Sequence, residues 1–346
     1  MASDYVKGLV SLLLICHNHE KFIGDAIESV LAQTYDNIEI IICDDFSTDH
    51  SWEIIQSFVP ELQKRFHRVV VYQNPQNLGL ILSMNKMVKE VRGAVTFWLS
   101  GDDMMAKNYV SDIMDACLEH PDASVFVTDG YWVDEADRYS ELDISLLTPF
   151  YQQKPDLSKE TLFQRLFWQN CIFAPGVSLR SEIYDKFGFY DPDICIEDLE
   201  YWLRISVTGE TEFVYIDKRD VFYRKNANSA TSKEKNEHYV ERWLIFFEAS
   251  EKIIEKYAPY VEVNEYIRRK FQFLLDEWQF YKRNIPKDEC KILRSKLGPF
   301  VKMNWRALGW KQLIEYYRMY ANALLNRAGR IFIDKEQDRQ LTDCED

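Results

Sequence analysis

The sequence lacks any segment suited to crossing a membrane or to directing secretion. None of its 346 residues lies in an uninterrupted run of the ~18 apolar residues that a membrane-spanning helix requires. The first residues, MASDYVKG, do not have the basic and then apolar layout of a signal peptide. We therefore expect the protein to work in the cytoplasm.

The sequence also lacks a cysteine pattern typical of a metal site or of a disulfide framework. Its seven cysteines are an odd number, are widely scattered, and include no C-x-x-C pair and no histidine at ligand spacing. We interpret them as reduced and mostly buried thiols.

Basic charge is scarce over most of the chain. The 56 Asp and Glu residues outnumber the 42 Lys and Arg residues, so the net charge is −14. Because the phosphates of nucleic acids require a basic face, we expect no nucleic-acid partner. Residues 265–330 are the exception, with 15 basic against 6 acidic side chains.

What the sequence does have is a globular composition and a regular alternation of strand and helix patterns. Apolar residues make up 47% of the chain, which argues against disorder. β-rich runs at 9–16, 38–45, 68–74 and 94–100 predict strands, and helical patterns at 20–33, 51–66 and 81–91 separate them. This alternation predicts an α/β fold whose central sheet is mostly parallel and carries helices on both faces.

The pattern changes twice along the rest of the chain. Shorter strands at 124–130, 176–180, 212–216 and 221–224, with a helix at 197–207, predict a mixed or antiparallel part that completes the sheet. After about residue 232 the strands stop, and helical patterns at 238–257 and 264–281 follow. We therefore predict a catalytic domain at residues 9–232 and a helical C-terminal region at 233–346.

Polar residues follow each of the first four predicted strands. Ligands of parallel sheets bind at the carboxyl ends of the strands, so these side chains are candidates for one shared site. They are His17 and Asn18, Asp44 and Asp45, Asn74 and Asn77, and Asp102 and Asp103.

Three acidic pairs have both a structural and a chemical interpretation. Asp102 and Asp103, in AVTFWLSGDDMM, either cap a helix at 104–106 or hold Mg²⁺ or Mn²⁺ together with substrate phosphates. Asp45 either starts the next helix, as Ser47 or Asp49 also could, or accepts hydrogen bonds from a nucleoside. Glu197 and Asp198 either favour a helix N-terminus or place Asp198 as a general base.

Four blocks together resemble the family 2 inverting glycosyltransferases with the GT-A fold. The blocks begin at VSLLLICHNHEKFIG, NLGLILSMNKMVKEV, GVSLRSEIYDKFGFY and VFYRKNANSAT, and they appear in the family's order between residues 9 and 232. The resemblance implies a GT-A fold, which is Rossmann-like, followed here by the C-terminal helical region.

The resemblance also implies a role for each matching residue. Asp45 corresponds to the acid that reads the N3–H of uracil or thymine. Asp103, together with Asp102 near the ribose and diphosphate, would bind Mn²⁺ or Mg²⁺, and Asp198 would be the catalytic base. The other residues assigned to nucleotide-sugar binding are His17, Asn18, Asn77, Glu197 and Arg224.

The chain departs from the family pattern at three positions. His17 stands where a tyrosine commonly stacks on the base, Met84 replaces a frequent basic residue, and Asn226 replaces a frequent histidine. None of these changes affects the four acids that carry the proposed chemistry.

The implied reaction moves a sugar from a nucleotide-diphosphate sugar, with UDP as the expected nucleotide, to a hydroxyl of a glycan or lipid-linked acceptor. The metal would spread the charge of the leaving diphosphate while Asp198 accepts the proton of the acceptor. With the base opposite the leaving group, the displacement inverts the anomeric carbon. By family analogy we expect a role in surface polysaccharide synthesis.

The C-terminal region has two open interpretations. Residues 298–313, GPFVKMNWRALGWKQL, interleave basic and aromatic side chains, and residues 311–325 have an amphipathic helical pattern. They either pack on the catalytic body or form a homodimer contact, or they lie on an anionic membrane as peripheral anchors on its inner face.

Three other classes of protein fit the sequence less well. A response-regulator-like receiver would need a further Asp at the third strand end, where Gln73 and Asn74 stand. A sugar nucleotidyltransferase would need a Gly-rich basic loop, which ICHNHEKFIG is not. A non-catalytic nucleotide-sugar-binding protein would keep Asp45 and Asp103 without requiring Asp198.

Overall fold

The computed structural model describes residues 4–151, 153–225 and 239–284, and the single residues 300, 304 and 308. The chain divides into two compact units, residues 1–249 and 250–346, and each unit is described by itself. The predicted domain boundary between residues 232 and 233 lies outside the described residues.

The first unit begins with four parallel strands that are not arranged in chain order. These are β1 (Val6–Cys16), β2 (Ile38–Asp44), β3 (Arg68–Gln73) and β4 (Gly93–Ser100), in the order β3-β2-β1-β4. They are connected by α1 (Ile23–Leu31), α2 (Ser51–Arg65) and α3 (Leu80–Val88). The predicted alternation of strands and helices is confirmed, although α1 begins later than its pattern predicts.

The rest of the unit completes a mixed sheet. Its strands are β5 (Met104–Met105), β6 (Ala123–Val133), β7 (Thr148–Pro149), β8 (Val177–Arg180) and β9 (Glu212–Arg224). β8 runs antiparallel to β4 and β6, whereas β6 and β9 are parallel. The helices are α4 (Tyr109–Glu119), α5 (Leu162–Trp168), α6 (Glu182–Phe187) and α7 (Glu197–Ser206), with 3₁₀ turns at Tyr139–Glu141, Ile144–Leu146 and Ala174–Gly176.

Two predicted elements differ from the structure. The strands predicted at 212–216 and 221–224 are one strand, β9, because irregularities in its register with β6 let it continue through the residues between them. Residues 104–106 do not begin a helix, since Met104 and Met105 pair with Phe222 and Val221 of β9. Asp102 and Asp103 therefore cap no helix, which removes the structural alternative for this pair.

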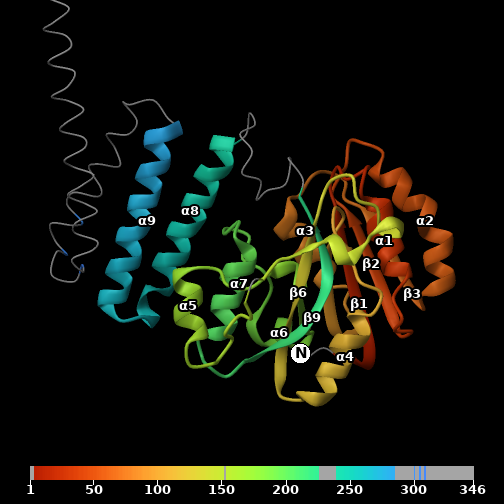
Figure 1. Cartoon of the computed structure of the whole chain (residues 1–346), viewed down its shortest axis with the longest axis horizontal. Coiled ribbons are helices and arrows are strands. Elements are labelled where there is room, and N and C mark those ends of the chain that lie inside the picture. The colour runs from red at the N-terminus through yellow and green to blue at the C-terminus, as the bar shows by residue number, and fades with distance from the viewer. Residues whose placement is uncertain are drawn as a thin grey trace, which may run out of the picture. The chain divides into compact units, whose positions relative to one another are not determined.

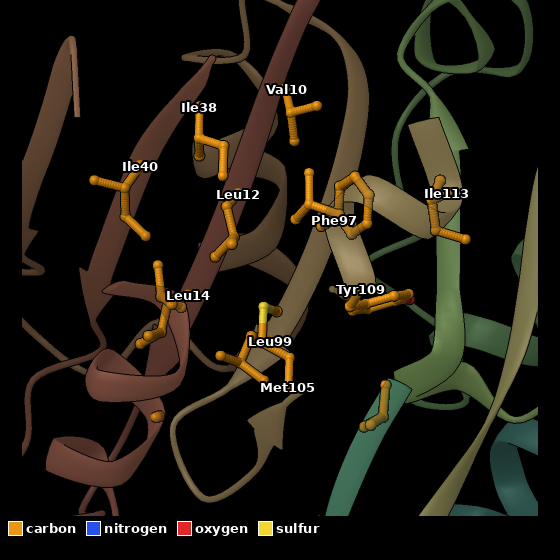
Figure 2. Packing of buried hydrophobic residues seen from close by; sticks show 14 of the residues in the cluster. Val10, Leu12, Leu14, Ile38, Ile40, Phe97, Leu99, Met105, Tyr109 and Ile113 are labelled. Atoms are coloured by element: carbon orange, nitrogen blue, oxygen red, sulfur yellow. The ribbon is translucent and has the colours of Figure 1, made fainter. Parts of the chain in front are cut away.

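The apolar core lies against one face of the β1–β4 half of the sheet. Alternate residues of neighbouring strands, among them Leu12, Leu14 and Ile40, contribute to it (Figure 2). Helices α1, α2 and α4 supply the other side, and α1 and α2 lie next to each other (Figure 1). Burial of each such aliphatic side chain contributes about 1.5–3 kcal/mol. This packing holds the carboxyl ends of the strands in place.

The opposite face of the same strands is covered by α3 and α6. α3 contacts β1 and β2 and buries Met84 and Met87. On α6, the hydroxyl of Tyr184 accepts a hydrogen bond from the indole of Trp98 on β4 at 3.1 Å. The sheet is thus covered on both faces, as the sequence predicts.

The second unit contains the C-terminal part of α8 (Tyr239–Tyr257), a 3₁₀ turn at Ala258–Tyr260 and α9 (Val263–Asn284). Lys270 of α9 donates to Glu251 and Glu255 of α8, at 2.7 Å each, and so ties the two helices together. These two predicted helices are confirmed. The predicted helix at 311–325 lies outside the described residues, as does most of the basic aromatic stretch before it.

Two further sequence predictions concern cysteines and membrane spans. The five cysteines that the structure describes are free thiols, and Cys16, Cys43 and Cys117 are buried. No helix among the described residues is long and apolar enough to span a membrane.

Candidate active site

The carboxyl ends of β1, β2 and β4 meet at one edge of the sheet. Cys16 is in register with Asp44 of β2, and Ile15 with Ser100 of β4. The pairing continues past the strands, because the N–H of Asp45 donates to the carbonyl of Cys16 and that of Gly101 to the carbonyl of Ile15, both at 2.8 Å. The polar segments that follow these strands therefore begin side by side.

A cavity of about 190 Å³ connects this edge with the first turn of α7. Its polar lining includes Asp103 from the β4 end and Glu197 and Asp198 from α7. Much of the remaining wall is apolar and aromatic, with Trp98 and Trp202 among its residues. Acids that are far apart in the sequence therefore line one shared cavity.

Asp103 is the most buried of the three cavity acids, with 3% of its surface exposed. Its Oδ1 accepts the backbone N–H of Arg224 at 2.9 Å, whereas Oδ2 accepts no hydrogen bond from the described residues. Burial, and after it the charge of Asp102, raises the pKa of Asp103 well above its usual value. The charged form of this carboxyl group is thus disfavoured here, and the Arg224 side chain offsets this only in part.

The turn that carries the two aspartates is shaped by small residues. The hydroxyl of Ser100 donates to Oδ1 of Asp102. A Cβ on Gly101 would lie 2.9 Å from Nδ1 of His19, so only glycine allows this close approach. His19 also faces the pair, with its Nε2 4.0 Å from Oδ2 of Asp102.

The buried side chain of Arg224 stabilises the turn that carries Asp102 and Asp103. It is 1% exposed, and its Nε donates to the carbonyl of Asp102 at 2.9 Å. Its Nη1 donates to the carbonyls of Asp134 and Asp137, at 2.9 and 2.7 Å, and its Nη2 lies 3.5 Å from Oδ2 of Asp25. In this conformation every guanidinium nitrogen is engaged with protein groups. The contacts make Arg224 a positioning residue for Asp102 and Asp103, and its assigned contact with the nucleotide sugar stays a prediction.

Glu197 and Asp198 occupy the first turn of α7, where the helix dipole favours negative charge. Burial and then the Asp198 charge raise the pKa of Glu197 to about 8, and burial also raises the pKa of Asp198. Two hydrogen bonds stabilise the charged form of Asp198: Oδ2 accepts from Asn170 and Oδ1 from the N–H of Leu199, both at 2.7 Å. For Glu197 the corresponding stabilisation comes from its own backbone N–H. The hydrogen bond from Asn170 therefore favours the negative charge of the pair on Asp198.

Asn170 is a site residue that no sequence pattern indicates. This residue lies in the loop after α5, and its own Oδ1 accepts the N–H of Ile172 at 3.1 Å, which orients the amide toward Asp198. A single asparagine in a loop has no distinctive pattern, so only the fold could identify it. The same is true of the aromatic residues Trp98, Tyr190 and Trp202, which line the cavity.

Asn170→Ala should raise the pKa of Asp198, because it removes a donor that stabilises the carboxylate. The acidic limb of the pH profile of kcat/KM should move up by about 1 pH unit, the equivalent of one hydrogen bond to a charged group. The control is Asn85→Ala, since among the described residues the Asn85 side chain bonds the backbone of Tyr190 alone, at 2.8 and 2.9 Å. It should alter activity or stability without moving the limb. If the acidic limb of the profile does not move in Asn170→Ala, then Asn170 does not stabilise the charged form of Asp198.

A second group of polar residues lies at the ends of β1 and β2, outside the cavity lining. Nδ1 of His17 lies 2.9 Å from the backbone carbonyl of Asp45, which can only accept a hydrogen bond. Nε2 then accepts from the amides of Asn18 and Asn77, at 3.2 and 3.1 Å. The imidazole ring is therefore held in one orientation by three neighbours.

Asp45 organises the turn that precedes α3. It is buried, and its Oδ1 accepts from the amide of Asn74 at 2.8 Å and from the N–H of Leu78 at 2.9 Å. Its Oδ2 accepts from the N–H of Gly79 at 2.8 Å, a residue whose φ of 82° suits glycine. Asp45 does not begin α2, which starts at Ser51, so the structural alternative for this residue is wrong.

The donors at the β4 end suit Mg²⁺ or Mn²⁺. No group of three or more His, Cys, Asp or Glu side chains among the described residues is arranged to hold a metal ion. These hard cations are commonly held by one or two carboxylates and complete their shell with water and substrate phosphates. The partly unsatisfied Asp103 beside Asp102 fits that arrangement.

The chain matches a known family over about half of its length. The model described as glycosyl transferase family 2 matches residues 11–188. This range includes the second half of β1, all of β2 to β4, the turn with Asp102 and Asp103, and the Asn170 loop.

Two relatives and one solved structure extend this similarity. An uncharacterized glycosyltransferase of Rickettsia typhi is 24% identical over 289 residues, which are 82% of this chain and 83% of that protein. The UDP-Glc:alpha-D-GlcNAc-diphosphoundecaprenol beta-1,3-glucosyltransferase WfaP of Escherichia coli is 26% identical over 233 residues, 65% of this chain and 81% of WfaP. The structure of S. aureus TarS in complex with UDP-GlcNAc superposes with a TM-score of 0.58 and 16% identity, covering 88% of this chain and 82% of that one, which shows a common fold.

Proposed function

The chain belongs to glycosyl transferase family 2 and has the GT-A fold, and from this we propose that it is an inverting transferase acting on a nucleotide-diphosphate sugar. The acceptor is a hydroxyl of a glycan or of a lipid-linked saccharide, in the synthesis of a surface polysaccharide. UDP is the proposed nucleotide, since WfaP is named for UDP-Glc and TarS was solved with UDP-GlcNAc.

One observation carries the proposal. Asp103, which follows the parallel strand β4, and Asp198, which begins α7, line the same cavity. A transferase needs two separate charges, one near the leaving diphosphate and one near the incoming alcohol. A protein that only bound the nucleotide sugar would have no use for the second.

Asp198 is the proposed general base. Its Oδ1 and Oδ2 are oriented by Leu199 and Asn170, and both oxygens retain lone pairs for the acceptor hydroxyl. Burial raises its pKa, which makes the ionised carboxylate a stronger base. Asp198 takes the proton as the bond from the acceptor oxygen to C1 forms and the bond from C1 to the diphosphate breaks. Attack opposite the leaving group inverts the configuration at C1.

Asp103 and Asp102 are the proposed ligands of Mn²⁺ or Mg²⁺. When bound, such an ion supplies Lewis-acid stabilisation of the diphosphate charge. Two hydrogen bonds from Arg224 would position these ligands. Its backbone N–H donates to the carboxyl group of Asp103, and its side chain donates to the backbone carbonyl of Asp102. His17, Asn18, Asp45 and Asn77 are proposed to hold the nucleoside at the ends of β1 and β2, with Glu197 beside the sugar.

The proposed location of the protein is the cytoplasm. If the acceptor is lipid-linked, we propose that the protein also contacts the inner face of the membrane peripherally. The basic aromatic segment that suggests this contact lies mainly outside the described residues. The same holds for a homodimer contact by this segment.

The proposed function is tested by incubating the full chain with UDP-, dTDP- and GDP-sugars and following hydrolysis or transfer. We expect turnover of at least one UDP-sugar that depends on added Mn²⁺ or Mg²⁺ and is lost with EDTA. If no nucleotide sugar is bound or consumed in the presence of either metal, the proposed function is wrong.

A further inference from the structure

The segment that follows β3 places a buried side-chain amide beside Asp45. This amide belongs to Asn74, which is 1% exposed. The backbone N–H of Asn74 donates to the carbonyl of Asp44 at 2.8 Å, so the pairing of β2 with β3 continues past the end of β3. The acid that is proposed to hold the nucleoside therefore has a fixed polar neighbour from the adjacent strand.

The hydrogen bonds of Asn74 fix the orientation of its amide. Nδ2 donates to Oδ1 of Asp45 and to the hydroxyl of Ser83, both at 2.8 Å. Oδ1 of Asn74 accepts from Nζ of Lys86, also at 2.8 Å. A carboxylate can only accept hydrogen bonds and an ammonium group can only donate them, so the amide fits this place in one orientation alone.

The ammonium group of Lys86 is held by a second contact. Its Nζ lies 4.3 Å from the centroid of the Tyr72 ring on β3, which is within the range of a cation–π interaction. Lys86 thus bonds the carbonyl end of the Asn74 amide, while the NH₂ end of the amide bonds Asp45. Hydrogen bonds in such a chain polarise one another, so the positive charge strengthens the bond that the amide donates to the carboxylate.

The contacts of Asp45 leave one position on its carboxylate where a ligand can donate a hydrogen bond. An ionised carboxylate has about two acceptor positions on each oxygen. Oδ1 accepts from Asn74 and Leu78, whereas Oδ2 accepts from Gly79 alone among the described residues. The remaining position is therefore on Oδ2, and the two bonds to Oδ1 oppose rotation of the carboxyl group.

We propose that Asn74 and Lys86 act as one positioning unit for Asp45, and that this unit gives the site its preference for a base with an imide N–H. The inference rests on the proposed function and deepens it, because it assigns the choice of nucleotide to two residues outside the cavity lining. Uracil and thymine carry a donor at N3, which Oδ2 of Asp45 accepts. Cytosine carries an acceptor at N3, which would face the carboxylate without a proton to share.

The test compares UDP with CDP on the full chain in the presence of Mn²⁺. The base preference is defined as the Kd of CDP divided by the Kd of UDP. We expect a value of at least ~10 in the unmodified chain, since a site built to bond a donor rejects the analogue that lacks it. Asn74→Asp keeps the shape of the side chain and its bond from Lys86 but removes the donor to Asp45. It should lower the base preference by about tenfold, the equivalent of one hydrogen bond to a charged group.

Asn37→Asp is the matched control for this substitution. The side chain of Asn37 donates to the carbonyl of Gly8 at 3.0 Å, and Asn37 precedes β2, at the opposite end of that strand from Asp45. The control should alter stability and leave the base preference unchanged. If Asn74→Asp weakens the binding of UDP and CDP equally, Asn74 has a structural role only and the proposal is overturned.

Lys86→Met tests whether the two residues act as a unit, because it removes the charge from a side chain of similar length. In the unmodified chain it should lower the base preference by about twofold or more, and in an Asn74→Ala chain it should lower it no further. An equal decrease in both chains would show that Lys86 acts on the nucleotide directly, and no decrease in either chain would exclude Lys86. Each of these two results would overturn the positioning unit.

The failure of this inference can be told apart from the failure of the proposed function. Equal binding of UDP and CDP by the unmodified chain would overturn the base preference and leave the proposed transferase intact. Failure of every nucleotide sugar to bind or react would remove the proposed function and this inference with it.

Discussion

Asp198→Asn is expected to lower turnover by at least ~10²-fold while nucleotide and metal binding remain nearly intact. Asparagine has the same shape but cannot accept the acceptor proton. The amide of Asn170, now 2.7 Å from Oδ2 of Asp198, would still find an oxygen to bond, so the loop should keep its position. The measurement is kcat for transfer, with UDP affinity measured in parallel by calorimetry.

The control for this substitution is Asp193→Asn, an exposed acid that precedes the same helix and lies outside the cavity lining. It should leave kcat within about twofold, because surface substitutions away from a site have small effects. Near-normal turnover by Asp198→Asn would reject Asp198 as the base. A parallel loss of UDP affinity would instead indicate that the substitution disturbs the whole site.

The second large effect is expected at Asp103. Asp103→Ala should abolish the part of nucleotide binding that depends on Mn²⁺, because it removes the cavity acid whose Oδ2 accepts no hydrogen bond from the part of the chain that the structure describes. Asp103→Asn should do the same while it still accepts the backbone N–H of Arg224, which now lies 2.9 Å from Oδ1. The readout is the shift in melting temperature caused by UDP, with Mn²⁺ and with EDTA, since a ligand that binds only the folded chain stabilises it.

Asp220→Asn is the matched control for this experiment. Asp220 is also a buried acid, on β9 four residues before Arg224, but it does not line the cavity. It should change the melting temperature of the free chain without abolishing the Mn²⁺-dependent shift. If Asp103→Asn keeps the full shift, the metal is held elsewhere and the assignment of Asp103 fails.

The candidate site could be predicted from the sequence only where its residues follow regular elements. Asp45, Asp102 and Asp103 each come directly after a strongly β-patterned run, and parallel strands bring their carboxyl ends to one edge. Asp198 was identified through the resemblance of its block and through its place at the start of a helical pattern. For these residues the relevant information is local, because it lies in the few residues on either side.

The missed and corrected features depend on contacts between distant parts of the chain. Asn170 acts on Asp198 across a loop and a helix, and nothing near it in the sequence marks that contact. Residues 104 and 105 form strand β5 and not the start of a helix, because they pair with β9, which lies more than a hundred residues later in the chain. The positioning role of Arg224 likewise comes from remote segments, since the carbonyls of Asp102, Asp134 and Asp137 converge on its guanidinium inside the protein, while its contact with the donor stays a prediction.

The sequence by itself determined the order of strands and helices, the covered parallel sheet and the acids available for chemistry. The periodicity of apolar residues and the polar residues at strand ends are properties of short segments. They can therefore be recognised in the sequence before it is known which other segments pack against them. The tertiary structure alone decided which acids share a cavity, which acid of the Glu197–Asp198 pair Asn170 stabilises, and that no basic residue of the described lining joins them. These are properties of distance and burial between remote segments, and the pKa of a carboxyl group responds to exactly such surroundings.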